Sequence, residues 1–266
     1  MKTIYLLCIS VIILFSSCAK TTHFGTMPNA PMFTKSLEAQ ATAGAGLDHL
    51  EAQGAISVLP FLGFTGNVFK GTKNRRFYEY GANLFVPLNQ SKSTFIALGA
   101  GKGKGKFDGS VYTGRGISSA TWYDVDSKFN TFYLQPTLYH IIKNEREGTR
   151  ISIGLGFKHE EIFFEKFNVS YNSSSGMSAY TYAFFNKADN GYGVIQTSFL
   201  CFNYESKDSP IYIDGQFGVR NIIKQFRTYN YNKTGSAYYT NPLNDERSLF
   251  FQRFMINITL GFRLSF

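Results

Sequence analysis

The chain has 266 residues, of which 44% are hydrophobic and 17% charged. Mean hydropathy is slightly negative at −0.14, and no internal stretch approaches the roughly 20 apolar residues of a membrane-spanning helix. Transmembrane helices are therefore excluded. The formal net charge of +9 would suggest a nucleic-acid partner in a cytosolic protein. Frequent Phe (27) and Tyr (17) beside this modest hydropathy are typical of a barrel that is apolar outside and polar inside.

The first residues, MKTIYLLCISVIILFSSCAK, have the organisation of an export signal. Positive Lys2 precedes an apolar run at 4–15, which is about a dozen residues long and too short for a membrane span. Two serines then lead directly into Cys18. This segment resembles a bacterial lipoprotein signal, although Phe15 stands where that family usually has Leu. The resemblance implies cleavage before Cys18 and a lipid on its side chain. An ordinary secretory signal is the alternative.

Cysteine use agrees with export. Cys8 lies in the predicted signal, Cys18 would carry the lipid and Cys201 alone remains, so we expect no internal disulfide. No cysteine–histidine cluster suggests zinc. We predict a signal peptide at 1–17, a lipidated periplasmic tether at 18–35 and a folded part at 36–266. No acidic run follows Cys18, which favours an anchor that faces the periplasm.

The folded part contains about ten segments in which polar and apolar side chains alternate with the period of a β-strand. In one of them, Thr131 and Gln135 oppose Phe132 and Leu134. Segment 192–206 fits neither phase well, which suggests a β-bulge there. The predicted strands cover residues 36–46, 49–58, 61–70, 76–88, 93–107, 128–142, 149–164, 192–206, 210–226 and 247–266.

The connections between these segments alternate in length. Short ones fall at 58–61, 87–92, 143–148 and 205–210, and long ones at 108–127, 165–191 and 227–246. Outer-membrane barrels show this asymmetry, with short periplasmic turns and longer extracellular loops. We therefore predict an all-β, antiparallel, up-and-down transmembrane β-barrel of ten strands, with both termini in the periplasm. The alternatives are eight strands plus a flanking hairpin, and a secreted β-sandwich.

The last predicted strand, 247–266, has one apolar and one polar face. Its residues Thr259, Gly261, Leu264 and Phe266 resemble the C-terminal β-signal of outer-membrane barrels, which the barrel-assembly machinery recognises. With the export signal, this makes the chain similar to the small outer-membrane β-barrel proteins of Gram-negative bacteria over most of its mature length. The resemblance implies an outer-membrane location and an encounter with that machinery.

If the apolar faces point outward, the inward faces carry charges of both signs. Opposite charges in a confined lumen are expected to pair, because an unpaired buried charge is costly. Side chains about fill a barrel of eight to ten strands, so we predict a packed polar interior. A narrow channel for small solutes is the alternative, and a porin-sized pore is excluded. The predicted interior network comprises Glu38, Glu51, Glu79, Arg150, Lys158, Asp214, Arg220, Arg253 and Arg263.

The stretch LGAGKGKGKF at 98–107 has the glycines and lysines of a phosphate-binding loop. It lacks the Lys-Ser or Lys-Thr that closes such a loop, and no helix pattern follows. The alternation is therefore that of a strand, with glycines on one face and lysines on the other. We expect the lysines to leave the outer wall at headgroup height and to contact lipopolysaccharide phosphates; a solvated strand end is the alternative. The predicted contact residues are Lys70, Lys73, Arg75, Arg76, Lys102, Lys104 and Lys106.

No spacing in the sequence points to catalysis. Only His159, beside Glu160 and Glu161, lies near the outer end of a strand. With a serine from 173–175 it would make a surface hydrolase acting on lipid A or protein. No triad spacing supports this, so we expect a rim histidine and no enzyme. We also expect no metal and no cofactor.

The long loops are rich in Tyr, Asn and Ser, a composition that suits binding surfaces. The expected function is a structural or interaction component of the outer membrane, or an accessory subunit of an outer-membrane complex. Outer-membrane lipids, lipopolysaccharide and the barrel-assembly machinery are the expected partners, with no nucleic acid.

Overall fold

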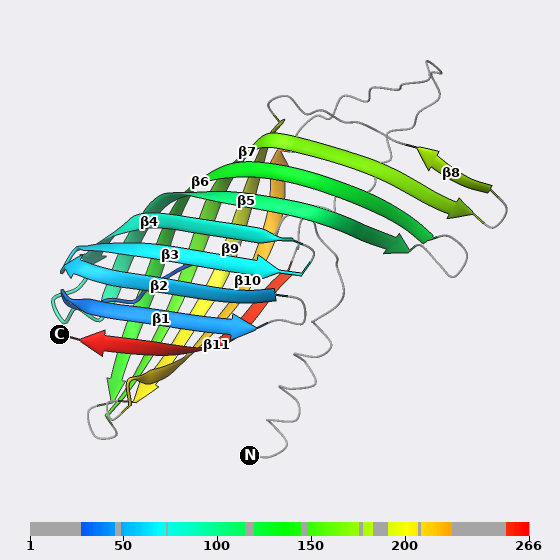
Figure 1. The fold of residues 1–266 in the computed structure, drawn as a ribbon. Helices are drawn as coiled ribbons and strands as arrows, with labels where there is room; N and C mark the ends of the chain where they lie inside the picture. The colour runs from blue at the N-terminus through cyan, green and yellow to red at the C-terminus, as the bar shows by residue number, and fades with distance from the viewer. Residues whose placement is uncertain are drawn as a thin grey trace, which may run out of the picture.

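The computed structural model describes residues 28–45, 49–72, 74–114, 120–144, 148–175, 178–182, 191–206, 209–224 and 254–265. All regular structure in these ranges is β-strand (Figure 1). The strands are β1 (Glu38–Ala45), β2 (His49–Leu59), β3 (Leu62–Gly71), β4 (Arg76–Pro87), β5 (Thr94–Gly114), β6 (Ala120–Asn144), β7 (Thr149–Ser175), β8 (Ser178–Tyr182), β9 (Gly191–Ser206), β10 (Ile211–Lys224) and β11 (Phe254–Ser265).

Ten of the eleven strands in the described ranges close into an antiparallel barrel. Strands β1 to β7 pair in chain order, β9 follows β7, and β11 returns to β1. The short β8 pairs with β7 outside this ring. Glu38 at the start of β1 is the partner of Ser265 at the end of β11, so the barrel begins and ends at the same rim. The predicted ten-stranded up-and-down barrel is confirmed.

The strands are staggered around the ring. Following Cα partners once around the barrel from Ile142 leads back to the same strand at Asn130, twelve residues away. A stagger of this kind accompanies a strand tilt of about 35–45°. The circuit passes through Ile151, Tyr204, Ile213, Leu260, Ala43, Ala52, Val68, Tyr78 and Lys104.

Three strands are longer than the alternation predicts. The predicted connection 108–127 is largely paired strand, because β5 and β6 stay in register as far as Gly114 and Ala120. The predicted connection 165–191 likewise contains the end of β7 and all of β8. In Figure 1 these strands run on past the ends of β1 to β4. These two predictions of loops are wrong over those residues. The long connection at 227–246 lies outside the described residues.

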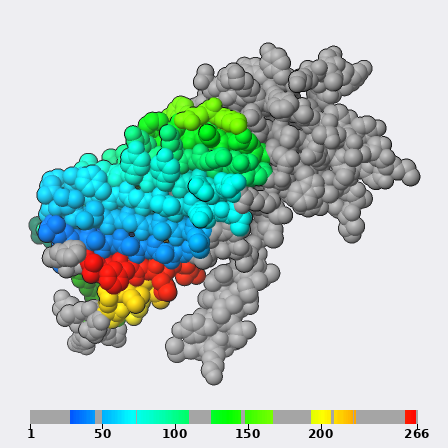
Figure 2. Space-filling view, in the orientation of Figure 1, coloured from blue at the N-terminus to red at the C-terminus, as the bar shows by residue number. Residues whose placement is uncertain are grey.

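Side-chain burial follows the predicted phases. In β6, Thr131, Gln135 and Thr137 are buried, whereas Phe132 and Leu134 are about half exposed on the outer wall. On the face seen in Figure 2, the outer sides of β11, β1, β2, β3 and β4 form one continuous wall. The exposed residues of this wall are mostly aliphatic or aromatic. The barrel therefore has an apolar outer surface, while many of its inward side chains are polar, as in barrels surrounded by lipid.

The bulge predicted in 192–206 is misplaced. β9 stays in unbroken register with β7, and the irregularity lies in β10 between Ile222 and Lys224. The weak alternation of polar and apolar residues in β9 has another cause. Its lumen-facing residues include the apolar Phe199 and Cys201, both 2% exposed, so that both faces of the strand are apolar there.

Candidate functional site

The segment before β1 lies inside the barrel. Met32 and Phe33 are each 2% exposed. The Asn29 amide donates to the carbonyl oxygen of Gly54 (3.1 Å) and to Oδ1 of Asn67 (2.7 Å), and the Gln135 amide donates to the Asn29 carbonyl (2.9 Å). We call residues 28–36 the plug. Part of the predicted tether, residues 28–35, is thus a lumenal element; Cys18 lies outside the described residues.

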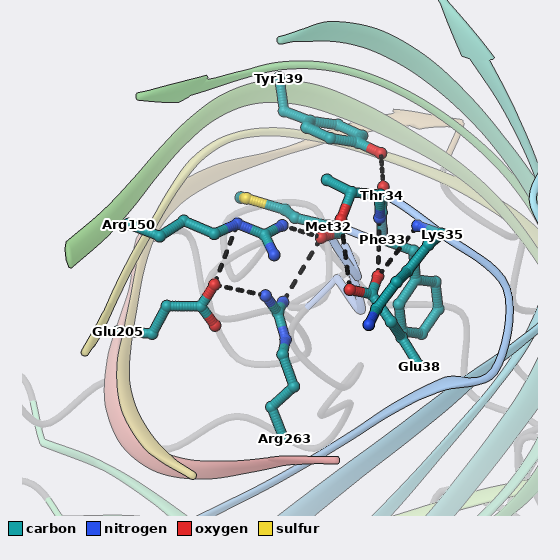
Figure 3. Close-up of polar contacts among 9 residues, drawn as sticks. All are labelled: Met32, Phe33, Thr34, Lys35, Glu38, Tyr139, Arg150, Glu205 and Arg263. Atoms are coloured by element: carbon teal, nitrogen blue, oxygen red, sulfur yellow. Dashed lines mark hydrogen bonds and ion pairs between the residues drawn. The ribbon is translucent and has the colours of Figure 1, made fainter. Parts of the chain in front are cut away.

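Two arginines and one carboxylate hold the centre of the plug (Figure 3). Arg150 and Arg263 both donate through Nη2 to the carbonyl oxygen of Met32, at 2.5 and 3.4 Å. Oε1 of Glu205 forms ion pairs with Nε of Arg150 (3.0 Å) and Nη1 of Arg263 (2.6 Å). One carboxylate therefore bridges two cations that come from β7 and β11, and both cations donate to the plug backbone.

A tight corner joins the plug to β1. The Glu38 carboxylate accepts from the backbone N–H groups of Thr34 (2.7 Å) and Lys35 (3.4 Å). The Ser57 hydroxyl donates to the Lys35 carbonyl (2.6 Å). Leu37 has a φ of 58°, a left-handed conformation that is rare for a residue with a branched side chain. The corner is thus held by charge-assisted hydrogen bonds against local strain.

An apolar layer surrounds the plug. Met32 and Phe33 pack with inward side chains of several strands, and the Phe33 ring meets the Phe85 ring edge-on at 5.5 Å. The Tyr139 hydroxyl donates to the Phe33 carbonyl (3.0 Å). The lumen-facing side chains of β9 belong to this layer, which explains why the sequence of β9 does not alternate between polar and apolar residues. The layer also includes Ala55, Phe95, Ala97, Ile141, Phe199 and Cys201.

A charged cluster occupies the middle of the lumen. Nζ of Lys158 lies 2.6 Å from Oε2 of Glu79, with both side chains 2% exposed, and 4.6 Å from the centre of the Tyr133 ring. The buried Arg220 interacts electrostatically with Glu160, and also with Glu51 and Glu79. Two cations from β7 and β10 thus face three carboxylates from β2, β4 and β7.

A second apolar layer lies beyond this cluster, toward the long hairpins. The Phe129 ring lies 5.9 Å from the Phe77 ring and 5.8 Å from the Phe164 ring. Glycines of β5 make room for these rings: a Cβ at Gly105 would come within 2.0 Å of Phe129, and one at Gly101 within 2.6 Å of Tyr133. The glycines of LGAGKGKGKF therefore belong to the packing of the lumen.

The described residues leave a small cavity beside the plug. A cavity of about 20 Å³ lies between the plug and the walls of β1, β2 and β10, where Asp214 and Gln216 contribute to its lining. That volume holds about one water molecule. Within the described ranges, no group of three or more His, Cys, Asp or Glu side chains is placed to hold a metal. Among the described residues, ion pairs of Glu205 and Lys158 link the main charges of the lumen, and the plug occupies the space beside Arg150 and Arg263.

The structure places the predicted interior residues in two groups. Glu38, Arg150 and Arg263 hold the plug, whereas Glu51, Glu79, Lys158 and Arg220 form the middle cluster. Asp214 lines the cavity beside the plug, accepts from the Gln216 amide (3.2 Å) and interacts electrostatically with Arg263. Arg253 lies outside the described residues.

Two functional carboxylates were missed by the sequence analysis. Glu205 lies where the predicted strand 192–206 overlaps the predicted turn 205–210, and it is the last inward position of β9. Glu160 is buried and Glu161 is exposed to 40%, so the two do not act together beside His159. The alternation from Lys158 places Glu160 on the same face, and this signal could have identified it.

The predicted lipopolysaccharide-contact residues differ in their exposure. Lys70, Arg76, Lys102, Lys104 and Lys106 are exposed on the outer wall, and Lys73 lies outside the described residues. Arg75 is only 6% exposed, and its inclusion is wrong. Its guanidinium donates to the carbonyl and hydroxyl oxygens of Thr72, both at 2.9 Å, because the turn between β3 and β4 directs this side chain inward.

The remaining predicted positions lie on the barrel wall. In the β-signal, Thr259 is buried and Leu264 is exposed, while Gly261 leaves room for the Tyr212 ring. Phe266 lies outside the described residues. His159 and Glu161 are 3.8 Å apart on the outer wall.

Comparison with known proteins gives no match: no protein family model, curated protein or solved structure matches this chain. Among the described residues, no helix is long and apolar enough to cross a membrane.

Proposed function

We propose that this chain is an outer-membrane β-barrel with a sealed lumen, anchored through a lipid on Cys18. It acts as a structural or interaction component of the outer membrane, or as an accessory subunit of a complex there. Outer-membrane lipids and the barrel-assembly machinery are its proposed partners. The long β5–β6 and β7–β8 hairpins would present its interaction surface.

The plugged lumen is the observation that carries this proposal. The plug is bound to the walls through Met32 and Asn29, and apolar layers lie on both sides of the charged cluster. A conducting pathway needs continuous water or polar groups that replace an ion's hydration shell. Two apolar layers in series provide neither, which favours a closed barrel over a narrow channel.

The outer wall supports the membrane location. Exposed apolar side chains follow the outward positions of neighbouring strands, as in Leu84, Leu98 and Leu134, which are 45–50% exposed. Contiguous apolar surface of this extent is rare on soluble monomers. A surrounding lipid phase explains both the apolar exterior and the buried charges within.

Conductance in planar bilayers tests the sealed lumen. We expect the wild-type protein, with insertion verified by a fluorescent label, to give no current steps above the bare membrane. Deletion of residues 28–36 should produce steps or noise, because the inner apolar layer loses Met32 and Phe33. Regular wild-type steps would contradict the sealed barrel and favour the narrow channel.

A further inference from the structure

Cationic side chains gather on one side of the outer wall. Six of them project outward from β3, β4, β5 and β6 near the long hairpins, and all are exposed. In the described parts of β1, β2, β9, β10 and β11, no Lys or Arg side chain lies on the outer face. We call this set the basic patch: Lys70, Arg76, Lys102, Lys104, Lys106 and Lys128.

The strand register brings four of these cations side by side. Lys70 is the partner of Arg76, Arg76 of Lys106, and Lys106 of Lys128. Neighbouring strands lie about 4.7–4.9 Å apart, so these charged groups can converge on one anion. Like charges on neighbouring strands repel one another, and a bound anion would relieve that repulsion.

Few protein groups neutralise the basic patch. Lys106 lies 3.5 Å from Asp108, and Lys102 lies 5.4 Å from the centre of the Tyr80 ring. Within the described ranges, no carboxylate forms an ion pair with Lys70, Arg76, Lys104 or Lys128. On the neighbouring β7, Lys166 is already paired with Asp126. The basic patch therefore has unbalanced positive charge.

An apolar surface adjoins the basic patch on the side away from the hairpins. Tyr78 and Tyr80 on β4 and Phe132 on β6 are 47–53% exposed. Leu84 and Leu98 continue the same outer faces toward the short turns and are also about half exposed. The rings lie beside the lysines nearest the short turns, since Lys104 is the partner of Tyr78, and Lys102 is the partner of both Tyr80 and Phe132. The aliphatic side chains follow farther toward the short turns. A lipid with a phosphorylated headgroup has the complementary order of charge and apolar chains.

We propose that the basic patch binds the phosphate groups of a multiply acylated phospholipid or phosphoglycolipid, with the acyl chains along Tyr78, Phe132 and Leu98. This inference rests on the proposed outer-membrane location, where lipopolysaccharide supplies such phosphates. Among the described residues, the cations lie on one side of the wall, which favours a lipid site over a general interfacial collar that would surround the barrel.

The test measures lipid retained by the purified full-length protein in detergent micelles. The probes are lipopolysaccharide, the same material with its phosphates removed, and inorganic phosphate as a competitor. The test variant is Arg76→Gln/Lys104→Gln/Lys128→Gln. The matched control is Lys92→Gln/Lys143→Gln, which removes two exposed cations at the opposite rim.

We expect the test variant to lose affinity for lipopolysaccharide by about tenfold or more, since each cation near an anionic lipid surface adds to the attraction. The control should bind as the wild type does, and dephosphorylated lipid should bind weakly to all three proteins. A charge-retaining variant, Lys104→Arg/Lys128→Arg, should also bind as the wild type does. Equal binding by the test variant, or by dephosphorylated lipid, would overturn the inference.

Displacement of the lipid by millimolar inorganic phosphate would overturn the lipid assignment and leave a site for free phosphate. Heat-dependent gel migration, recorded on every sample, separates this failure from failure of the proposed function. If the test variant binds lipopolysaccharide as the wild type does, and both migrate as folded barrels, only the lipid site is rejected. A wild-type protein that conducts in planar bilayers would reject the sealed barrel itself.

Discussion

The ammonium group of Lys158 lies 2.6 Å from the Glu79 carboxylate in the middle of the barrel, and both side chains are 2% exposed. Neither charge reaches bulk water, so each depends on the other and on the surrounding network. Glu160 and Glu51 also interact electrostatically with Glu79. Lys158 is therefore the cation that allows several carboxylates to share one narrow lumen.

This arrangement predicts an unequal response to removing either charge. Lys158→Met leaves Glu79 and its neighbouring carboxylates facing Arg220 alone, and should lower the free energy of unfolding by about 3–5 kcal/mol. Glu79→Gln leaves Lys158 with Glu160 and should cost less, about 1–3 kcal/mol. Urea titration in micelles, with heat-dependent gel migration as the readout of unfolding, measures the free energy of unfolding of both variants. The exposed Lys143→Met is the control, with an expected change within about 0.5 kcal/mol; equal losses for the two lumenal variants would reject the shared-cation arrangement.

The corner between the plug and β1 predicts a change in protease sensitivity. Glu38→Gln removes the charge that accepts from the Thr34 and Lys35 N–H groups, and hydrogen bonds to a charged group contribute about 1.5–3 kcal/mol. Trypsin cleavage after Lys35 should become about tenfold faster. Glu165→Gln provides the control, because the Glu165 carboxylate accepts a hydrogen bond from the Asn130 amide on the outer wall, away from the plug. Unchanged cleavage in Glu38→Gln would show that the carboxylate does not hold the plug.

The packing of β5 predicts opposite outcomes for two glycines. Gly105→Ala brings a methyl group within 2.0 Å of the Phe129 ring, whereas a Cβ at Gly54 meets nothing within 4 Å. Overpacking of this kind costs about 1–3 kcal/mol, so Gly105→Ala should be destabilised and Gly54→Ala should not. Thermal unfolding of both proteins in micelles makes the comparison. Recovery of stability in Gly105→Ala/Phe129→Leu would identify the ring as the obstacle, and a stable Gly105→Ala alone would refute the close packing.

The proposed anchor makes a prediction that does not involve the barrel. Cys18→Ala should abolish incorporation of radiolabelled palmitate, because the resemblance to a lipoprotein signal makes Cys18 the acceptor. Cys201→Ala is the matched control and should keep the label, since Cys201 is buried in the lumen. Label retained by Cys18→Ala would remove the lipoprotein interpretation while leaving the barrel in place.

The sequence predicts the strands well where the wall separates an apolar exterior from a polar lumen. The segment 61–70 differs from β3 by one residue at each end, and the segment 76–88 differs from β4 by one residue at its C-terminal end. The prediction fails beyond this belt, where pairing continues through residues 108–114 without an apolar face to mark it. Alternation of polar and apolar residues shows where the two faces of a strand meet different environments. It does not show where the backbone hydrogen bonds between strands continue.

The plug could not be predicted from local pattern. Its residues NAPMFTK have no strand or helix period. Its place depends on partners distant in the chain, such as Tyr139, Arg150 and Arg263. By contrast, the charged residues of the lumen were accessible to sequence reasoning, because alternation fixes the face of each side chain once the exterior is known to be apolar.

The membrane-spanning wall is tested most directly by quenching of tryptophan fluorescence with lipids brominated on their acyl chains. Trp122, the single tryptophan, is first replaced by Phe, and one new tryptophan is then placed at Leu98 or at Lys92. Leu98 lies on the outer wall, 45% exposed within the apolar surface, whereas Lys92 lies in the short turn between β4 and β5. In reconstituted vesicles, the Leu98→Trp protein should be quenched strongly and the Lys92→Trp protein weakly. Equally weak quenching at both positions would contradict a barrel that crosses the membrane.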